Sequence, residues 1–135
     1  MKLIFSDFKP FQRGTKKVLG ELEADILDVI WDSEPVTVRE VCDKLNRNRN
    51  IAYTTVMTVM GRLAKKGYLE KNKCENTAAY IYNSVITKDE FQKSIVSSVI
   101  KGLMEDYKDQ VLSHFASEVS KDELDKIEQL VKDEV

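Results

Sequence analysis

The sequence predicts a mostly helical protein of the α+β class, in which three short helices and a β-hairpin precede a longer helical region. Three observations predict it. Apolar residues recur at spacings of three and four through most of the chain, the period of a helix with one buried face. Two short segments after Gly67 alternate instead, as strands do. Capping patterns, a Ser or Thr followed three residues later by Glu, begin at Thr37, Thr87 and Ser120.

The first predicted helix covers residues 20–33. Gly20 is an acceptable N-cap, and two acidic residues follow it near the positive end of the helix dipole. Trp31 is expected to pack in the core, and Pro35 ends the helix. The predicted buried stripe consists of Leu22, Ile26, Val29 and Ile30.

The second predicted helix covers residues 37–46 and starts with a capping box of Thr37 and Glu40. A polar turn follows at residues 46–50, where Asn50 is predicted to cap the next helix. Two helices joined by a turn and followed by a third have the order of a helix-turn-helix. The inward residues of the second helix are Val38, Val41, Cys42 and Leu45.

The third predicted helix covers residues 50–67, and we expect it to carry the function. Its buried stripe consists of Val56, Val59, Met60 and Leu63. The other face has no acid, and it carries Tyr53, Thr54, Met57, Thr58, Gly61, Arg62 and Lys65. Thr side chains contact base edges and thymine methyls, whereas Arg and Lys contact guanine or phosphate. The pattern therefore predicts a recognition helix that lies in the major groove of DNA.

A β-hairpin is predicted next. Residues 68–73 and 78–82 alternate, and residues 74–77 supply a turn between them. Three helices followed by a hairpin form a winged helix. Lys71 and Lys73 lie near the predicted tip, where they either contact phosphate or serve as exposed solubilising lysines.

Residues 1–18 precede this domain as an extension. Phe5, Phe8 and Phe11 are spaced by three, but Pro10 interrupts any helix there. The extension is either a tail whose aromatic side chains pack on the body or a basic arm that touches the DNA backbone. We favour the tail.

Residues 19–86 are thus the predicted winged-helix DNA-binding domain, and residues 87–135 are a helical domain. Apolar residues recur in the helical domain every four residues. Because a helix has 3.6 residues per turn, successive members of this series lie progressively further around it, and one straight helix cannot bury them all on one side. We therefore expect a bend or break between Gly102 and Asp109. A last helix starts at Ser120 and is predicted to bury Leu124, Ile127, Leu130 and Val131.

These C-terminal helices carry more apolar surface than they can bury alone. They either fold back on the winged helix or pair with a second chain, and a two-fold dimer would match a palindromic DNA site. The residues predicted to dimerise are Phe91, Ile95, Val99, Leu103, Tyr107, Val111, Leu112, Phe115, Leu124 and Ile127.

The charge distribution also favours DNA. The net charge is −2, but residues 46–73 hold seven Lys and Arg and one acidic residue. Such a local excess indicates an anionic partner, whereas a solvated basic face is the plainer alternative. The cations of this window are Arg47, Arg49, Arg62, Lys65, Lys66, Lys71 and Lys73.

Other function classes find little support. His114 is the only histidine and has no catalytic pattern around it, and no Cys and His cluster has zinc spacing. We expect no catalytic activity, no cofactor and no metal. No apolar run is long enough to span a membrane, so a cytoplasmic location is expected. Cys42 and Cys74 are expected to stay reduced.

The run AYTTVMTVMGRLAKKG at residues 52–67 closely resembles the recognition-helix motif of the penicillinase repressor family, the BlaI, MecI and CopY regulators. The run LGELEA at 19–24 with VIW at 29–31 resembles the opening helix of that family, and YIY at 80–82 resembles its second wing strand. The resemblance extends over residues 19–131 and is strongest over 19–83.

The resemblance implies a homodimeric transcriptional repressor that binds double-stranded DNA at a palindromic operator upstream of β-lactamase or metal-resistance genes. By motif position, Thr54, Thr55, Thr58 and Arg62 would read the DNA, and Ala52 and Tyr53 would lie at the helix entrance near the backbone. Together with Arg49, Lys65, Lys66, Lys71 and Lys73, these are the predicted DNA-binding residues.

Two features depart from the family. Its β-lactamase repressors are inactivated by a protease that cuts an Asn-Phe bond in the C-terminal domain. This chain has no Asn after Asn83, and the matching region lies near residues 100–102. An inducing protease acting on the C-terminal domain is therefore implied by resemblance alone, and either cleavage at another bond or a different mode of induction remains open. The Cys-x-Cys pair of the copper-responsive members is also missing, because the last cysteine is Cys74.

The function predicted from the sequence is a homodimeric, sequence-specific repressor of a β-lactamase or antibiotic-response operon, relieved by an inducer pathway. Two alternatives remain open. The winged helix could be a protein-interaction module without DNA binding, or the repressor could control an unrelated stress or metal operon.

Overall fold

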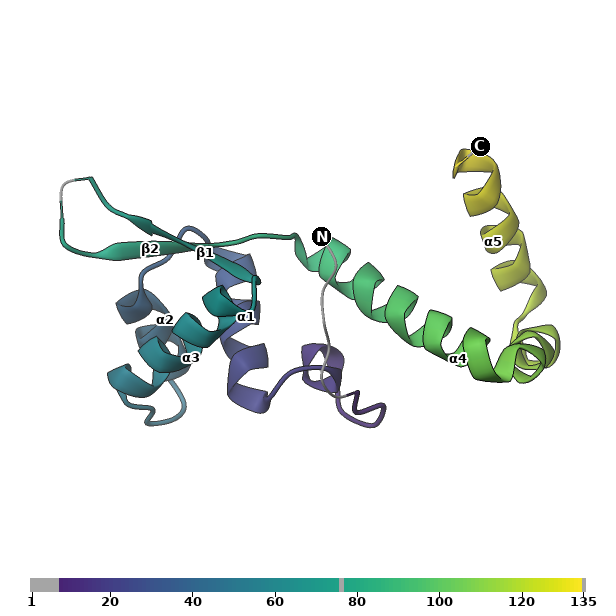
Figure 1. Ribbon diagram of the computed structural model, residues 1–135, viewed down its shortest axis with the longest axis horizontal. Helices are drawn as coiled ribbons and strands as arrows, with labels where there is room; N and C mark the ends of the chain where they lie inside the picture. Colours follow the sequence, from purple (N-terminus) through teal and green to yellow (C-terminus); the bar gives the residue numbers. More distant parts are fainter. Residues whose placement is uncertain (1–7, 76, 135) are drawn as a thin grey trace. The chain divides into compact units, whose positions relative to one another are not determined.

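The computed structural model describes residues 8–75 and 77–134 (Figure 1). The chain divides into two compact units between Ile95 and Val96. The predicted domain limits of 1–18, 19–86 and 87–135 stay predictions. The elements are η1 (Gly14–Lys17), α1 (Glu21–Ser33), α2 (Val38–Leu45), α3 (Tyr53–Lys65), β1 (Leu69–Lys73), β2 (Tyr80–Ser84), α4 (Lys88–Glu118) and α5 (Lys121–Glu134).

The core of the first unit lies among α1, α2, α3 and the hairpin. Because each helix keeps its apolar residues on one stripe, the three stripes meet and exclude water. The predicted stripes of α2 and α3 are buried throughout, and in α1 Ile26 and Ile30 are buried while Leu22 and Val29 are partly buried. The periodicity in the sequence thus located the core correctly.

The start of α2 has the predicted cap. The Thr37 hydroxyl oxygen accepts a hydrogen bond from the Glu40 backbone N–H at 3.2 Å. The Glu40 carboxylate accepts from the same hydroxyl at 3.2 Å, whereas the usual capping box has the backbone N–H of the cap residue as donor. The cap satisfies a backbone group that would otherwise lack a partner in the helix.

The predicted hairpin is confirmed. Strands β1 and β2 pair antiparallel, with Leu69 opposite Ser84 and Lys73 opposite Tyr80. A short third segment was not predicted: Val36 donates to the Tyr82 carbonyl at 3.1 Å and accepts from the Tyr82 N–H at 2.7 Å. This bridge fastens the connection between α1 and α2 to the hairpin and completes a winged helix.

The segment before α1 is partly packed. Thr15 is buried in η1 and its hydroxyl donates to the Asp28 carboxylate at 3.4 Å. Burial raises the pKa of Asp28, while the charge of Lys88 and the Thr15 hydrogen bond oppose that rise. The predicted packing of the aromatic tail is wrong for Phe11, which is 99% exposed and lies inside a turn closed by the Gln12 N–H donating to the Lys9 carbonyl at 3.2 Å. Phe8 is 41% exposed, and Phe5 lies outside the described residues.

The first turns of α4 belong to the first unit. The Thr87 hydroxyl caps the helix by accepting from the Glu90 N–H at 3.1 Å. Phe91 is fully buried, with its ring centroid 5.2 Å from that of Trp31 and 5.7 Å from that of Tyr68. The predicted role of Phe91 in a dimer is therefore wrong, because its side chain has no surface left for a second chain.

The second unit contains the rest of α4 and α5. Tyr107 leaves the helical conformation, with φ −132° and ψ 36°, which confirms the bend predicted between Gly102 and Asp109. At the start of α5, Ser120 and Glu123 form the reciprocal capping box, each accepting from the backbone N–H of the other at 3.1 Å. The hydrogen bonds from Ser120, chiefly that from its backbone, hold the pKa of Glu123 below its usual value.

The sequence predicts that the apolar residues of α5 are buried, but within this chain they are not. Leu124, Ile127, Leu130 and Val131 all stay about half-exposed. In the described part of the chain, no helix combines the length and the apolarity needed to cross a membrane.

Replacing Phe91 with alanine should lower the free energy of unfolding by about 3–5 kcal/mol, because a fully buried ring is lost and a cavity replaces it. Chemical denaturation of the full chain at fixed concentration measures this change. Phe11→Ala is the matched control: it removes the same atoms from a solvated position and should change the free energy by less than about 0.5 kcal/mol. Equal losses for the two variants would show that Phe91 is not a core residue.

Candidate nucleic-acid interface

The outer face of α3 is polar, basic and free of acidic residues. Thr54, Thr55, Thr58, Arg62 and Lys65 are all exposed on it. They face outward because the buried stripe of the same helix fixes its rotation against the core.

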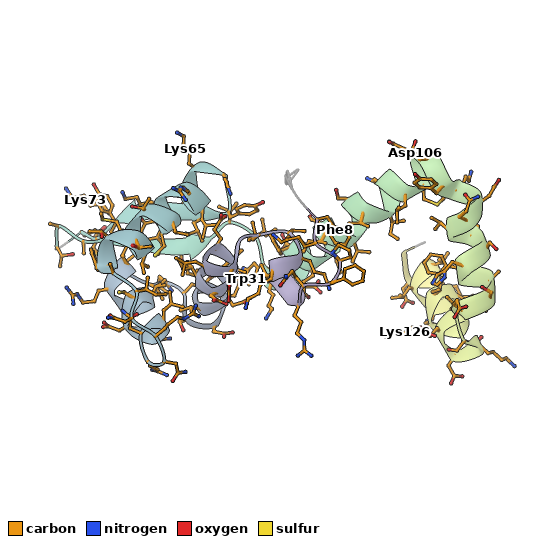
Figure 2. The ribbon with its side chains drawn as sticks, turned by 90° about the horizontal axis from the view of Figure 1, so that it is seen from below. Phe8, Trp31, Lys65, Lys73, Asp106 and Lys126 are labelled. Carbon is orange, nitrogen blue, oxygen red and sulfur yellow. The ribbon has the colours of Figure 1, made fainter. Side chains whose placement is uncertain are left out.

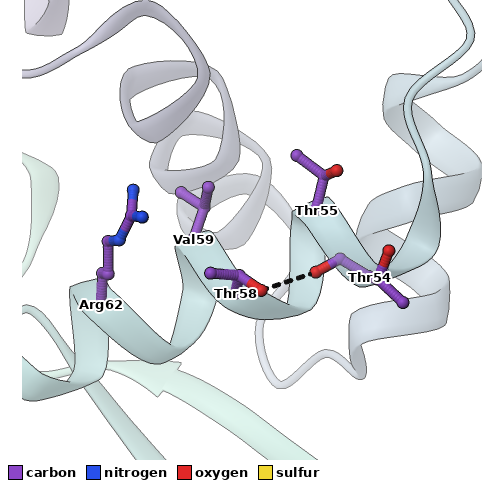
Figure 3. Close-up of a pocket in the computed structure, with 5 residues that line it drawn as sticks. All are labelled: Thr54, Thr55, Thr58, Val59 and Arg62. Atoms are coloured by element: carbon purple, nitrogen blue, oxygen red, sulfur yellow. Dashed lines mark hydrogen bonds between the residues drawn. The ribbon is translucent and has the colours of Figure 1, made fainter.

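Four of these residues share one hollow. Thr54, Thr55, Thr58 and Arg62, together with Val59, line a surface concavity of about 240 Å³ (Figure 3). The Thr58 hydroxyl donates to the Thr54 carbonyl at 2.8 Å. Its proton is thereby engaged by the helix, so the oxygen is left as an acceptor for an incoming donor, and the methyl group is available for apolar contact.

The entrance to α3 is set by Asn46 rather than by Asn50. The Asn46 side-chain oxygen accepts from the Ile51 N–H at 2.6 Å, and its amide nitrogen donates to the Ile51 carbonyl at 2.9 Å. We call this pair of hydrogen bonds the bracket. Because the bracket holds the chain at Ile51, the helix begins at Tyr53. Its N-cap is Ala52, which makes no side-chain cap, so the predicted capping role of Asn50 is wrong.

The end of α3 has the predicted glycine. Gly67 has φ 92°, a left-handed conformation that glycine adopts without strain. Tyr68 donates to the Leu63 carbonyl at 3.0 Å and Gly67 to the Ala64 carbonyl at 3.1 Å, which is a Schellman motif. The chain then turns directly into β1.

The predicted cations differ in their surroundings. Within the described ranges, Arg62 and Lys65 form no ion pair, and Figure 2 shows Lys65 extending away from the body of its unit. Arg49 instead pairs with Asp25 at 2.8 Å, and Lys66 pairs with Glu23 at 2.9 Å. Both acids lie on α1, so two of the predicted phosphate contacts already have carboxylate partners.

The hairpin places its two lysines on one face, because alternate residues of a strand point the same way. Lys71 lies with its ammonium 4.1 Å from the ring centroid of Tyr80, a cation–π contact, and Lys73 is paired directly opposite Tyr80. This exposed group adds a second basic surface near the tip of the wing.

Arg39 is a candidate that the sequence did not identify. Its guanidinium lies 5.5 Å from the ring centroid of Tyr53 at the start of α3. Both residues are exposed, and Ala52 beside them is exposed as well. In the sequence, Arg39 is only an interior residue of the capping box. No local pattern indicates that the fold places it beside Tyr53 at the entrance to α3.

The residues predicted to dimerise lie in two environments. Ile95 packs against the core of the first unit with Phe91. In the second unit Val99 and Val111 are partly buried, and the larger side chains of this group are exposed: Leu103, Tyr107, Leu112, Phe115, Leu124 and Ile127.

Clusters of His, Cys, Asp and Glu that could hold a metal ion do not occur among the described residues. The thiol of Cys42 is buried, and it lies 3.8 Å from the Ile51 carbonyl and 3.3 Å from the Asn46 amide nitrogen. It therefore packs beneath the bracket at the entrance to α3.

Comparison with known proteins matches the family described as "Penicillinase repressor" to residues 19–133. The transcriptional regulator BlaI of Mycobacterium tuberculosis is 37% identical over 109 residues, which cover 79% of this chain and 78% of that protein. The penicillinase repressor of Staphylococcus aureus is 23% identical over 113 residues, covering 82% and 88%. Among solved structures, the DNA-binding domain of the repressor BlaI superimposes with a TM-score of 0.45 at 26% identity, covering 50% of this chain and 80% of that one.

Replacing Asn46 with alanine should lower the free energy of unfolding by about 1–3 kcal/mol, because the partly buried Ile51 N–H loses its partner and the Ile51 carbonyl keeps only the weak contact with the Cys42 thiol. Hydrogen exchange at the Ile51 amide should accelerate in the same variant. Asn48→Ala, at an exposed position in the same loop, should leave both quantities unchanged. Slow exchange at Ile51 in Asn46→Ala would mean that the bracket does not hold the entrance to α3.

Proposed function

Because the chain belongs to the penicillinase repressor family, whose members are transcriptional repressors rather than enzymes, we propose that it represses transcription by binding a specific DNA operator through α3. The observation that carries the proposal is the acid-free outer face of α3, where a hollow lined by threonines adjoins Arg62 and Lys65, neither of which has an ion-pair partner among the described residues. A face that served only solubility would mix acids with bases.

The threonines and the arginine read the sequence of the operator. The engaged hydroxyl of Thr58 accepts from an exocyclic amine of adenine or cytosine, and the threonine methyls contact the methyl group of thymine. Arg62 pairs with the edge of a guanine, where two parallel hydrogen bonds distinguish it from other bases.

The remaining cations bind the phosphate backbone and position α3. Lys71 and Lys73 reach it from the wing, Lys65 from the end of α3, and Arg39 with Tyr53 from its entrance. Arg49 and Lys66 exchange their carboxylate partners for phosphate. The cations of these pairs are exposed and their carboxylates are partly buried, so the exchange costs more than the about 0–1 kcal/mol that a fully exposed ion pair contributes.

The second unit forms a homodimer with another copy of this chain. Leu124, Ile127 and Val131 recur at spacings of three and four along α5, so they form an apolar stripe, and the described residues leave it about half-exposed. A second copy presents the same stripe, and a two-fold pair brings two copies of α3 to the two halves of a palindromic operator.

The operon controlled is of the β-lactamase or antibiotic-response type, as the relatives suggest by name. We further propose that an inducer pathway releases the operator. Since the chain has no Asn after Asn83, either a protease cuts the second unit at a bond other than Asn-Phe, or induction does not proceed by proteolysis.

Arg62→Ala should weaken binding to the operator by about 1–3 kcal/mol and relax the preference for one base pair, because a base contact is lost. Lys71→Ala should weaken binding to all sequences alike and reduce the salt slope by about 1, because a phosphate contact is lost. Mobility-shift titrations at several salt concentrations, with a duplex selected by the wild-type protein from a randomised library, measure both changes.

Two outcomes would count against the proposal. Wild-type protein without salt-dependent affinity for duplex DNA would favour a protein-interaction module. Wild-type affinity and specificity in Arg62→Ala would remove the outer face of α3 from the interface.

Ile127→Asp should convert the protein from a dimer to a monomer, because a carboxylate placed in the apolar stripe resists burial. Analytical ultracentrifugation measures the mass, and circular dichroism checks that helices persist. Ile127→Leu keeps the stripe apolar and should remain dimeric. A single-chain mass for the wild-type protein would refute the dimer itself.

A further inference from the structure

Gly61 lies in the middle of the outer face of α3. It follows Thr58 by three residues and Thr54 by seven, and it precedes Lys65 by four, so all four fall on one line along the helix. The side of the helix that points most directly away from the core therefore carries no side chain at Gly61, one turn after Thr58. We call this position the gap.

A glycine at this position weakens the helix. Relative to alanine, glycine in an exposed helix interior lowers the folding equilibrium constant about fivefold, because the unfolded chain gains freedom. A positive φ or a crowded neighbour would explain such a residue. Gly61 has neither: the glycines with positive φ are Gly14 and Gly67, and a Cβ built at Gly61 meets nothing within 4 Å.

The threonines beside it give a reason for the gap. Threonine is a short side chain, so its hydroxyl and methyl group touch a base edge only if the helix backbone itself comes close to the floor of the groove. A long side chain one turn further along the same line would hold the helix away. The residue at position 61 therefore limits how closely Thr54 and Thr58 approach the bases.

We propose that Gly61 is the point of closest approach between α3 and DNA, where the edge of a base pair lies against the glycine backbone and no side chain fits between them. The inference rests on the proposed operator binding and adds a residue that determines its geometry. Because Gly61 has no side chain, the helix comes close enough for the short threonine side chains to reach the base edges.

A size series at position 61 tests this. Gly61→Ala should raise the melting temperature by roughly 3 °C, because the helix is strengthened, and yet weaken operator binding about tenfold. Gly61→Gln should weaken binding further, by about a hundredfold, because its side chain is longer. The salt slope should stay as in the wild-type protein, because no phosphate contact is removed.

Gly102→Ala is the matched control. Gly102 also lies inside a helix, and a Cβ built there also meets nothing within 4 Å. It should raise the melting temperature in the same way and leave operator affinity unchanged. The control separates a steric effect at the interface from a general effect of helix stabilisation.

The outcomes separate this inference from the function on which it rests. If the wild-type protein binds the selected duplex and Arg62→Ala binds weakly, while Gly61→Ala binds as the wild-type protein does, only the close approach at Gly61 is refuted. Equal losses for Gly61→Ala and Gly61→Gln would also refute it, since a steric limit must depend on size. Absence of duplex binding by the wild-type protein would refute both.

Discussion

The rotation of α3 about its own axis is the constraint on which the candidate site depends. Val56, Met60 and Leu63 are fully buried against α1 and α2, and a rotation that exposed them would cost about 1.5–3 kcal/mol for each side chain. The same rotation turns the threonines and Arg62 outward. The outer face of α3 is thus oriented by apolar contacts on the opposite, buried side of the helix. The bracket at Ile51 and the Schellman motif after Lys65 fix where this face begins and ends.

Local patterns in the sequence were sufficient to predict the helices, the hairpin, the bend at Tyr107 and the outer face of α3. Each depends on residues within a few positions of one another, so periodicity and capping chemistry report them directly. The features that were missed join distant residues: the pairing of Val36 with Tyr82, the position of Arg39 beside Tyr53, and the burial of Phe91. The sequence pattern around an apolar residue at the start of a helix is the same whether that residue packs in its own domain or against a second chain. Only the tertiary fold therefore shows that Phe91 is a core residue.

The ion pairs of α1 affect how the basic surface is to be understood. Counting charge in the sequence treats Arg49 and Lys66 as equal to Arg62 and Lys65. In the folded chain Asp25 and Glu23 partly neutralise the first two, so the strongest uncompensated charge on α3 adjoins the threonine hollow. Under the proposed function, binding of phosphate by Arg49 and Lys66 releases carboxylates rather than solvent ions, so their share of the salt dependence is smaller than a count of cations suggests.

The composition of α3 explains why its outer face can specialise. The helix contains three threonines, two valines and a glycine, all poor helix formers, and it lacks a side-chain N-cap. Its stability therefore comes from the buried stripe and from the backbone hydrogen bonds at its two ends, not from intrinsic propensity. Because the outer residues contribute little to folding, they are free to be chosen for what they contact. Under the proposed function, a substitution there changes recognition while the fold persists, whereas one at Val56 or Met60 would remove part of the packing that holds the outer face of α3 in place.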